Sequence, residues 1–237
     1  FFSRRGHDSP LRSGPVFERI VVIMELVRRR VAASRGVAWN DAACGWWPSS
    51  SHHWQRTRAA TRLGAPVIRV FAGPQQKNPK DWQTAAKNAK REDVEGWMAE
   101  ALHTCAEHGE KFGVLVAVQN HGDFISTGPE HLSLLQRVDH SWCGALVDTG
   151  KYFSDDPYAD IAMMTPYAMN WQIKETLGSR LKSPPTDFQR LTKIIHDGGY
   201  RGFVPIETLA MGRKDYDPAA EVVKVLAAMR EAISSLQ

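Results

Sequence analysis

Polar side chains that can bind a ligand or move a proton recur where apolar segments of this chain end. A parallel strand that is covered on both faces is a continuous apolar run, so polar residues at its carboxyl end point into a shared cleft. The spacing therefore predicts an α/β active site that is built from several strand ends. The residues at these ends are Gln119, Asn120, His121, Asp148, Gln172, Lys174 and Glu207.

The two carboxylates are the strongest functional candidates. Asp148 and Glu207 each follow an apolar run, and a carboxylate in such a position must be paired, hydrogen-bonded or bound to a metal. The alternative is that each only accepts hydrogen bonds from loop amides. His121 lies two residues after Gln119 and is either a proton carrier or a structural group.

Two basic residues also belong to expected strands. Lys174 alternates with Gln172 on one strand face, so both can reach the cavity, and an ammonium suits a phosphate or carboxylate. Pairing of Lys174 with Glu207 or with Glu175 is an equally good interpretation. Arg69 lies among apolar strand residues, where a cation needs a buried acidic partner or an anionic ligand.

Helices and strands alternate after residue 60 with short glycine-marked joins, which is typical of parallel βαβ units. The expected strands are 66–73, 113–119, 143–148, 169–174 and 202–207, and the expected helices are 91–110, 129–138, 156–168 and one from 217 onward. A capping box over Thr186–Gln189 predicts a further helix that ends at Gly198. Nearer the N-terminus, the pattern predicts a helix over 17–34 and a strand over 36–44.

The length indicates one domain over residues 1–237, since α/β barrels exceed the usual domain length of about 150 residues. Residues 1–60 form an atypical basic segment with ten Arg, no Lys and four acidic residues. Its arginines resemble those of a solvated helix face, so we expect no nucleic-acid partner.

Three widely separated cysteines fit a reducing compartment, and no apolar run approaches the roughly 20 residues of a membrane span. We therefore expect a cytoplasmic protein.

The motifs at Arg69–Gly73, Gln119–His121, Asp148–Gly150, Trp171–Glu175 and Gly202–Leu209 together resemble the sugar phosphate isomerase/epimerase family. Its members are xylose isomerase-like TIM barrels related to endonuclease IV, so the resemblance implies an α/β fold of that kind. A closed barrel has eight strands, and the chain before residue 36 is too short for two more βα units. We expect the barrel to be incomplete or irregular at its N-terminal strands. Exposed strand edges then favour a homodimer, which light scattering would test.

The resemblance also implies one divalent metal in the barrel mouth, held by Glu, Asp, His and Glu. Asp148 and Glu207 match two of these positions, whereas Gln119 and Gln172 stand where the family has Glu and His. Amides lower the affinity because hard divalent ions prefer charged oxygen. We expect Mn²⁺, Mg²⁺ or Zn²⁺ on Asp148 and Glu207, with Gln172 and either Gln119 or His121 assisting.

For activity, the resemblance implies proton transfer next to the carbonyl of a sugar or sugar phosphate. A one-base shift through Glu207 is favoured because Gln119 cannot act as a second base. The alternatives are a metal-dependent hydrolase of a phosphodiester or other ester, and a barrel that only binds carbohydrate. The expected catalytic residues are Glu207, Lys174 and His121, and the expected substrate-binding residues are Arg69, Asn120 and Gln119.

Overall fold

The computed structural model describes residues 50–72, 82–83, 86, 89–122, 124–178, 183–210 and 213–236. Its centre is a four-stranded parallel sheet whose strands follow one another in chain order. The strands are β1 (Val67–Phe71), β2 (Leu115–Gln119), β3 (Cys143–Asp148) and β4 (Ala168–Gln172). The predicted helix 17–34 and strand 36–44 lie outside the described residues.

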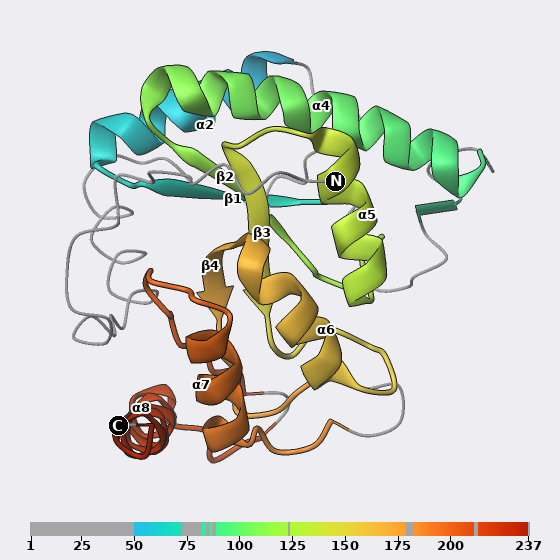
Figure 1. The fold of residues 1–237 in the computed structure, drawn as a ribbon. Coiled ribbons are helices and arrows are strands. Elements are labelled where there is room, and N and C mark those ends of the chain that lie inside the picture. The colour runs from blue at the N-terminus through green and yellow to red at the C-terminus, as the bar shows by residue number, and fades with distance from the viewer. Residues whose placement is uncertain are drawn as a thin grey trace.

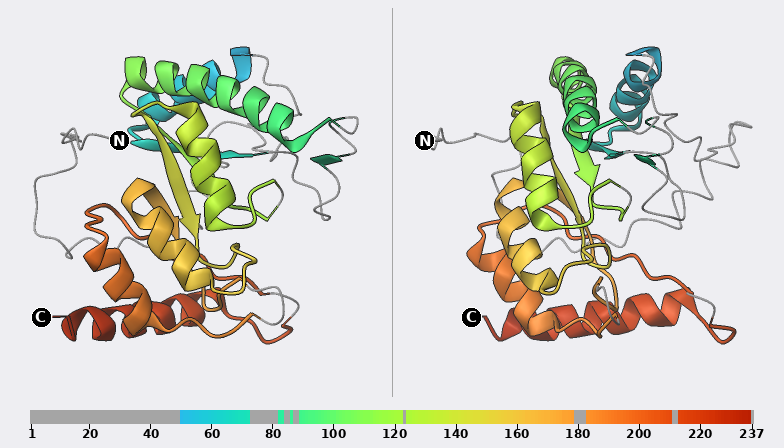
Figure 2. Two further views of the ribbon diagram at one scale, coloured as in Figure 1. Left: turned by 45° about the vertical axis from the view of Figure 1, so that its right-hand side comes forward. Right: turned by 90° about the vertical axis from the view of Figure 1, so that its right-hand side faces the viewer.

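Helices alternate with these strands and surround one side of the curved sheet (Figures 1 and 2). Each helix packs on the next helix in chain order, and α4, α5 and α6 also contact the strands. This arrangement confirms the predicted βα alternation. The helical elements are α2 (Ser50–Leu63), α4 (Arg91–Phe112), α5 (Gly128–Val138), α6 (Pro157–Met164), the 3₁₀ turn η1 (Thr165–Tyr167), α7 (Phe188–Asp197) and α8 (Pro218–Ser234).

Several predicted boundaries are wrong. Helix α4 continues beyond Gly109 and ends at Phe112. Its C-cap is Gly113, whose φ of 68° is the left-handed conformation that glycine adopts without a Cβ clash. The predicted strand 202–207 is reduced to one parallel bridge between Ile206 and Ile173. The predicted helix 156–168 divides into α6 and η1.

The predicted capping box at Thr186 is also wrong. Asp187 is the residue that caps α7, because its carboxylate accepts a hydrogen bond from the amide of Arg190 at 3.0 Å. The Thr186 hydroxyl instead donates to the carbonyl of Lys174 at 2.7 Å. Sequence spacing alone cannot separate these arrangements, since either side chain can cap a helix.

The two faces of the sheet differ in chemistry because side chains alternate along a strand. Val116, Val118, Val147 and Trp171 point to the helix side and are fully buried in the apolar core. The alternate residues place amide, carboxylate and ammonium groups on the opposite face. The sheet therefore packs against helices on one side and carries the functional candidates on the other.

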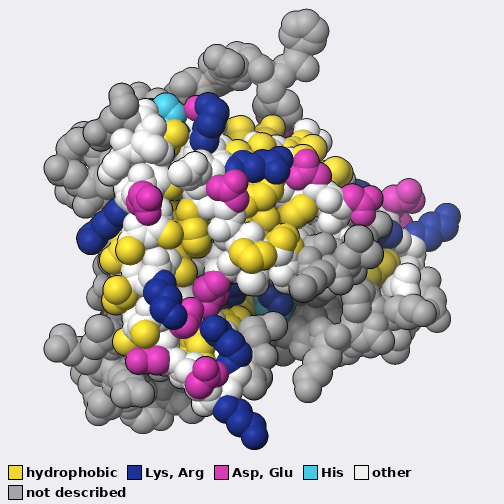
Figure 3. Space-filling model, turned by 90° about the horizontal axis from the view of Figure 1, so that it is seen from below, with side chains coloured by type: hydrophobic (Ala, Val, Ile, Leu, Met, Phe, Trp, Pro, Cys, Tyr) yellow, Lys and Arg dark blue, Asp and Glu magenta, His cyan; other side chains and the backbone are white. Residues whose placement is uncertain are grey.

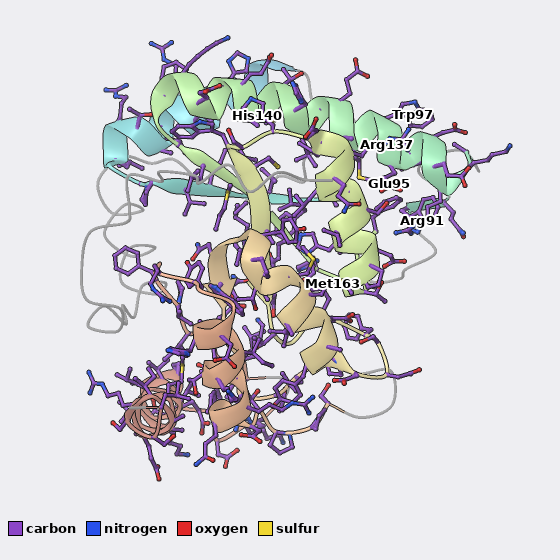
Figure 4. The ribbon with its side chains drawn as sticks, in the orientation of Figure 1. Arg91, Glu95, Trp97, Arg137, His140 and Met163 are labelled. Atoms are coloured by element: carbon purple, nitrogen blue, oxygen red, sulfur yellow. The ribbon has the colours of Figure 1, made fainter. Side chains whose placement is uncertain are left out.

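Polar contacts outside the core join α4 to α5 along one seam, where Figure 4 labels Arg91, Glu95 and Arg137. Arg137 donates to the carbonyl of Glu92 at 3.0 Å, and the hydroxyl of Ser133 donates to Glu95 at 2.6 Å. On the face drawn in Figure 3, basic and acidic side chains are interspersed. No helix in the described ranges is both long enough and apolar enough to cross a membrane.

We expect His131 to make the folded state less stable as the pH falls from about 6.5 to about 4. The ring is fully buried and contacts the Tyr152 hydroxyl at 2.9 Å and the Val118 carbonyl at 3.1 Å. Burial lowers the pKa of His131 to about 4, although the bond to Val118 opposes the shift. Between these pH values the unfolded state binds more protons than the folded state. The stabilisation of the folded state that neutral His131 provides at neutral pH, about 3 kcal/mol, is therefore lost on acidification.

Urea unfolding at pH 7 and pH 5 measures this effect in the wild type and in His131→Gln. The raised pKa of Asp148 stabilises the folded state as the pH falls, which opposes the effect of His131. Asp148 is present in both proteins, so the difference between their pH dependences isolates His131. His196→Gln, at an exposed histidine, is the control. An unchanged pH dependence in His131→Gln would contradict the assignment.

Candidate functional site

The ends of β2, β3 and β4 bring three predicted site residues into direct contact. Nε2 of Gln119 donates to Oδ2 of Asp148 at 2.7 Å. In one orientation of its amide, Gln172 accepts from Gln119 at 2.6 Å. In the other, Gln172 donates to Asp148 Oδ2 and accepts from Arg69, both at 3.1 Å. All three strand-end side chains are buried, so the predicted convergence of strand ends is present in the structure.

Asp148 is an almost fully buried carboxylate. Its Oδ1 accepts a hydrogen bond from the amide of Gly150 at 3.0 Å. Burial raises the pKa of Asp148 to about 6; Lys174 opposes the rise and the negative charge of Glu207 adds to it. The group is thus mostly ionised at neutral pH and gains a proton only slightly below it.

Lys174 lies between the two predicted carboxylates. Its ammonium makes a direct ion pair with Oε2 of Glu207 and lies 3.6 Å from Oδ2 of Asp148. Glu207 reaches this position because Ile206 pairs with Ile173, which sets the following residues of the two segments side by side. Of the sequence alternatives for Lys174, the structure contains the pair with Glu207.

Residues around Lys174 hold both its backbone and its side chain. The Thr149 hydroxyl accepts from the Lys174 amide at 3.0 Å, and the Thr186 hydroxyl donates to the Lys174 carbonyl at 2.7 Å. A Cβ on Gly150 would lie 3.0 Å from Lys174 Cδ, so this glycine leaves room for the lysine stem. Sequence reasoning missed the two threonines; the signal for Thr149 was its place directly after Asp148.

Asn120 bonds the backbone of Asp148 through both ends of its amide. Its Nδ2 donates to the Asp148 carbonyl at 2.9 Å, and its Oδ1 accepts from the Asp148 amide at 2.8 Å. The side chain is fully buried. Asn120 therefore positions Asp148, and its contact with a substrate stays a prediction.

We expect Asn120→Ala to lower the free energy of unfolding by about 1–3 kcal/mol for each Asp148 backbone group left buried and unpaired. Chemical denaturation measures the loss. Asn170→Ala, at a partly exposed position of β4, is the matched control. Equal losses of unfolding free energy in the two variants would show that the hydrogen bonds from Asn120 to Asp148 do not stabilise the fold.

Arg69, Phe71 and His121 form one wall on the same face. The Arg69 guanidinium lies 4.8 Å from the Phe71 ring centre, and the His121 ring meets Phe71 edge to face at 4.8 Å. Burial lowers the pKa of His121 to about 4, helped by the positive charges of Lys151, Arg69 and Lys174. His121 is therefore neutral at physiological pH and able to accept a proton only weakly.

The donor set does not fit the predicted divalent ion. Asp148 already accepts hydrogen bonds from N–H groups of Gln119 and Gly150, and the Lys174 ammonium is its ion-pair partner. Amide hydrogens and an ammonium face the carboxylates where a dication would need free oxygen lone pairs. In the described part of the chain, no group of three or more His, Cys, Asp or Glu is placed to hold a metal. The expectation of Mn²⁺, Mg²⁺ or Zn²⁺ on these residues is therefore not supported by their geometry.

Solved structures of similar fold include two sugar epimerases. A 3-keto-D-glucoside 4-epimerase from E. coli is 14% identical with a TM-score of 0.61, and the match covers 77% of this chain and 70% of the epimerase. An L-ribulose 3-epimerase is 15% identical with a TM-score of 0.63, covering 79% and 69%. A xylose isomerase-like TIM barrel protein from Mycobacterium smegmatis in complex with magnesium is 16% identical with a TM-score of 0.59, covering 77% and 67%. These likenesses show the fold.

Sequence comparison identifies the family independently. No curated protein matches the chain. The family model described as xylose isomerase-like TIM barrel matches residues 51–232. This match spans most of the chain, including every strand end of the site, and it agrees with the consecutive parallel sheet. The chain therefore belongs to the xylose isomerase-like TIM barrel family.

Proposed function

We propose that this protein is a sugar isomerase or epimerase that moves a proton on the carbon next to a carbonyl. The observation that carries the proposal is the cluster of Glu207, Lys174 and Asp148 on the sheet face opposite the helices. It combines a carboxylate that can take a proton with a cation that can stabilise an oxygen anion. The two epimerases of similar fold support the class of reaction.

Glu207 is the proposed base because it is the more exposed carboxylate, with 22% of its side chain accessible against 1% for Asp148. Its carboxylate takes the proton from the carbon, and the C–H electron pair forms the double bond of an enediolate. The former carbonyl oxygen then carries the negative charge, next to the Lys174 ammonium. Glu207 returns the proton to the former carbonyl carbon. The proton of the adjacent hydroxyl passes to the former carbonyl oxygen, so that this hydroxyl becomes the new carbonyl and an aldose–ketose shift results.

The other residues bind and orient the sugar in this proposal. The amide of Gln119 and the guanidinium of Arg69 are donors for hydroxyl oxygens, and the apolar edge formed by Phe71 and His121 suits a sugar carbon face. Gln119 cannot accept a proton at neutral pH, so it is no second base. The one-base reaction is favoured for that reason.

Proton exchange in heavy water tests the proposal directly. The purified protein is incubated in D₂O with a panel of aldoses and ketoses and their phosphates, and ¹H NMR follows the hydrogen next to the carbonyl. We expect deuterium to enter at that carbon of at least one sugar, with formation of the isomer. Absence of exchange across the panel would contradict the proposed reaction.

A sugar-binding protein without turnover is the second candidate. The observation that favours it is that both carboxylates are already paired with Lys174. Calorimetric titration with the same sugars separates the two candidates. Binding together with exchange supports the enzyme, whereas binding without exchange supports the carbohydrate-binding protein.

A further inference from the structure

We propose that the Lys174 ammonium is the permanent cation of this site and makes a divalent metal unnecessary. The magnesium complex of similar fold shows that a chain of this architecture can be solved with a metal ion. Here the cation is supplied by the protein itself, between Asp148 and Glu207. That the site binds a sugar rests on the proposed function. That its cation is Lys174 rests only on the positions of Lys174, Asp148 and Glu207.

The charges on this face are compensated without an added ion. Two buried or partly buried carboxylates in one site need positive charge nearby, because unpaired ions are costly away from water. Lys174 supplies it to both at once, and only 8% of its side chain is exposed. A dication on the same oxygens would lie next to the ammonium, and like charges at that separation repel strongly.

The lone pairs that a metal would use are also engaged by N–H donors. Oδ1 of Asp148 accepts from the Gly150 amide, and Oδ2 accepts from Gln119. Gln119 and Gln172 contribute no charge. A hard divalent ion would compete with these donors for the Asp148 oxygens, and the two amides would add no charge to hold it.

Lys174 is held in place and cannot easily swing aside. Thr149 and Thr186 bind its backbone amide and carbonyl, and Gly150 packs against its aliphatic stem. An ammonium has three N–H donors. One donates to Glu207. With Asp148 Oδ2 3.6 Å away, the others remain for the carbonyl or hydroxyl oxygen of a sugar.

Equilibrium dialysis against Mn²⁺ and Zn²⁺, followed by elemental analysis, tests the inference on the whole chain. We expect the wild type and Lys174→Arg to retain no stoichiometric metal. We expect Lys174→Met to take up about one equivalent and to gain thermal stability from it, because the variant removes the ammonium that pairs with both Asp148 and Glu207. Lys193→Met removes an exposed lysine that pairs with Asp197 and is the matched control.

Two results would overturn the inference. One is a wild type that retains about one equivalent of metal and loses it in Asp148→Asn. The other is a folded Lys174→Met that takes up no metal. Lys174→Gln, which also removes the positive charge but keeps a polar side chain, replaces Lys174→Met if that variant does not fold; if neither folds, the wild-type dialysis decides.

The metal readout is independent of the sugar reaction. A protein that fails every sugar in the exchange screen still gives a metal content, so failure of the proposed function leaves this test intact. A wild type that holds metal and isomerises a sugar would overturn only the role of Lys174.

Discussion

Glu207→Gln is expected to slow proton exchange next to the sugar carbonyl by a factor of about 10²–10⁴. The amide has nearly the same shape as the carboxylate, and its oxygen can still accept a hydrogen bond from Lys174. It cannot take a proton from carbon at neutral pH. The loss should therefore appear in the exchange rate measured by NMR in D₂O.

The readout must separate lost chemistry from lost binding. If Glu207 is the base, the maximal exchange rate falls while the sugar dissociation constant from calorimetry stays within a few-fold. Glu110→Gln, at an exposed glutamate 3.7 Å from His140, is the matched control and should retain full exchange. Unchanged exchange in Glu207→Gln would remove Glu207 from the proposed mechanism.

Trp171→Ala is expected to lower the free energy of unfolding by about 3–5 kcal/mol. The indole is completely buried on the helix side of β4, and its ring meets Tyr200 edge to face with centres 5.7 Å apart. Truncation removes a large apolar surface from the core and leaves a cavity that the surrounding strands and helices cannot fully close. Urea denaturation followed by circular dichroism measures the loss.

The neighbouring residue provides a test of the two-faced sheet. Gln172 follows Trp171 directly but points to the opposite face, so Gln172→Ala should change the site and cost much less stability. Trp97→Ala is the control for losing an indole, because Trp97 is 41% exposed on α4. Losses of similar size in the three variants would contradict the separation of core and site.

Much of the fold could be predicted from local sequence. The apolar runs that become β2 and β3 are continuous because both faces of these strands are buried, and the glycine-marked joins indicate parallel βαβ units. The family match confirms the barrel class that the strand-end motifs around Asp148 and Glu207 resembled. Helix ends were less predictable, since capping depends on backbone geometry, as Thr186 and Asp187 show.

Site membership followed from the sequence, but individual tasks did not. Strand alternation already places Gln119, Asp148 and Gln172 at the same edge of a sheet. It also placed Asn120 at that edge, directly after Gln119. There the side chain bonds the Asp148 backbone, a partner 28 positions away in sequence.

The sequence by itself determined the βα order, the apolar and polar faces of the strands and the set of polar residues at the strand ends. These features depend only on chain order and on the alternation of side chains along a strand. Only the tertiary structure decided which charges pair. The bridge between Ile173 and Ile206 joins segments far apart in the chain and thereby places Lys174 beside Glu207 and Asp148. The position of an ammonium between two carboxylates is a consequence of that long-range contact.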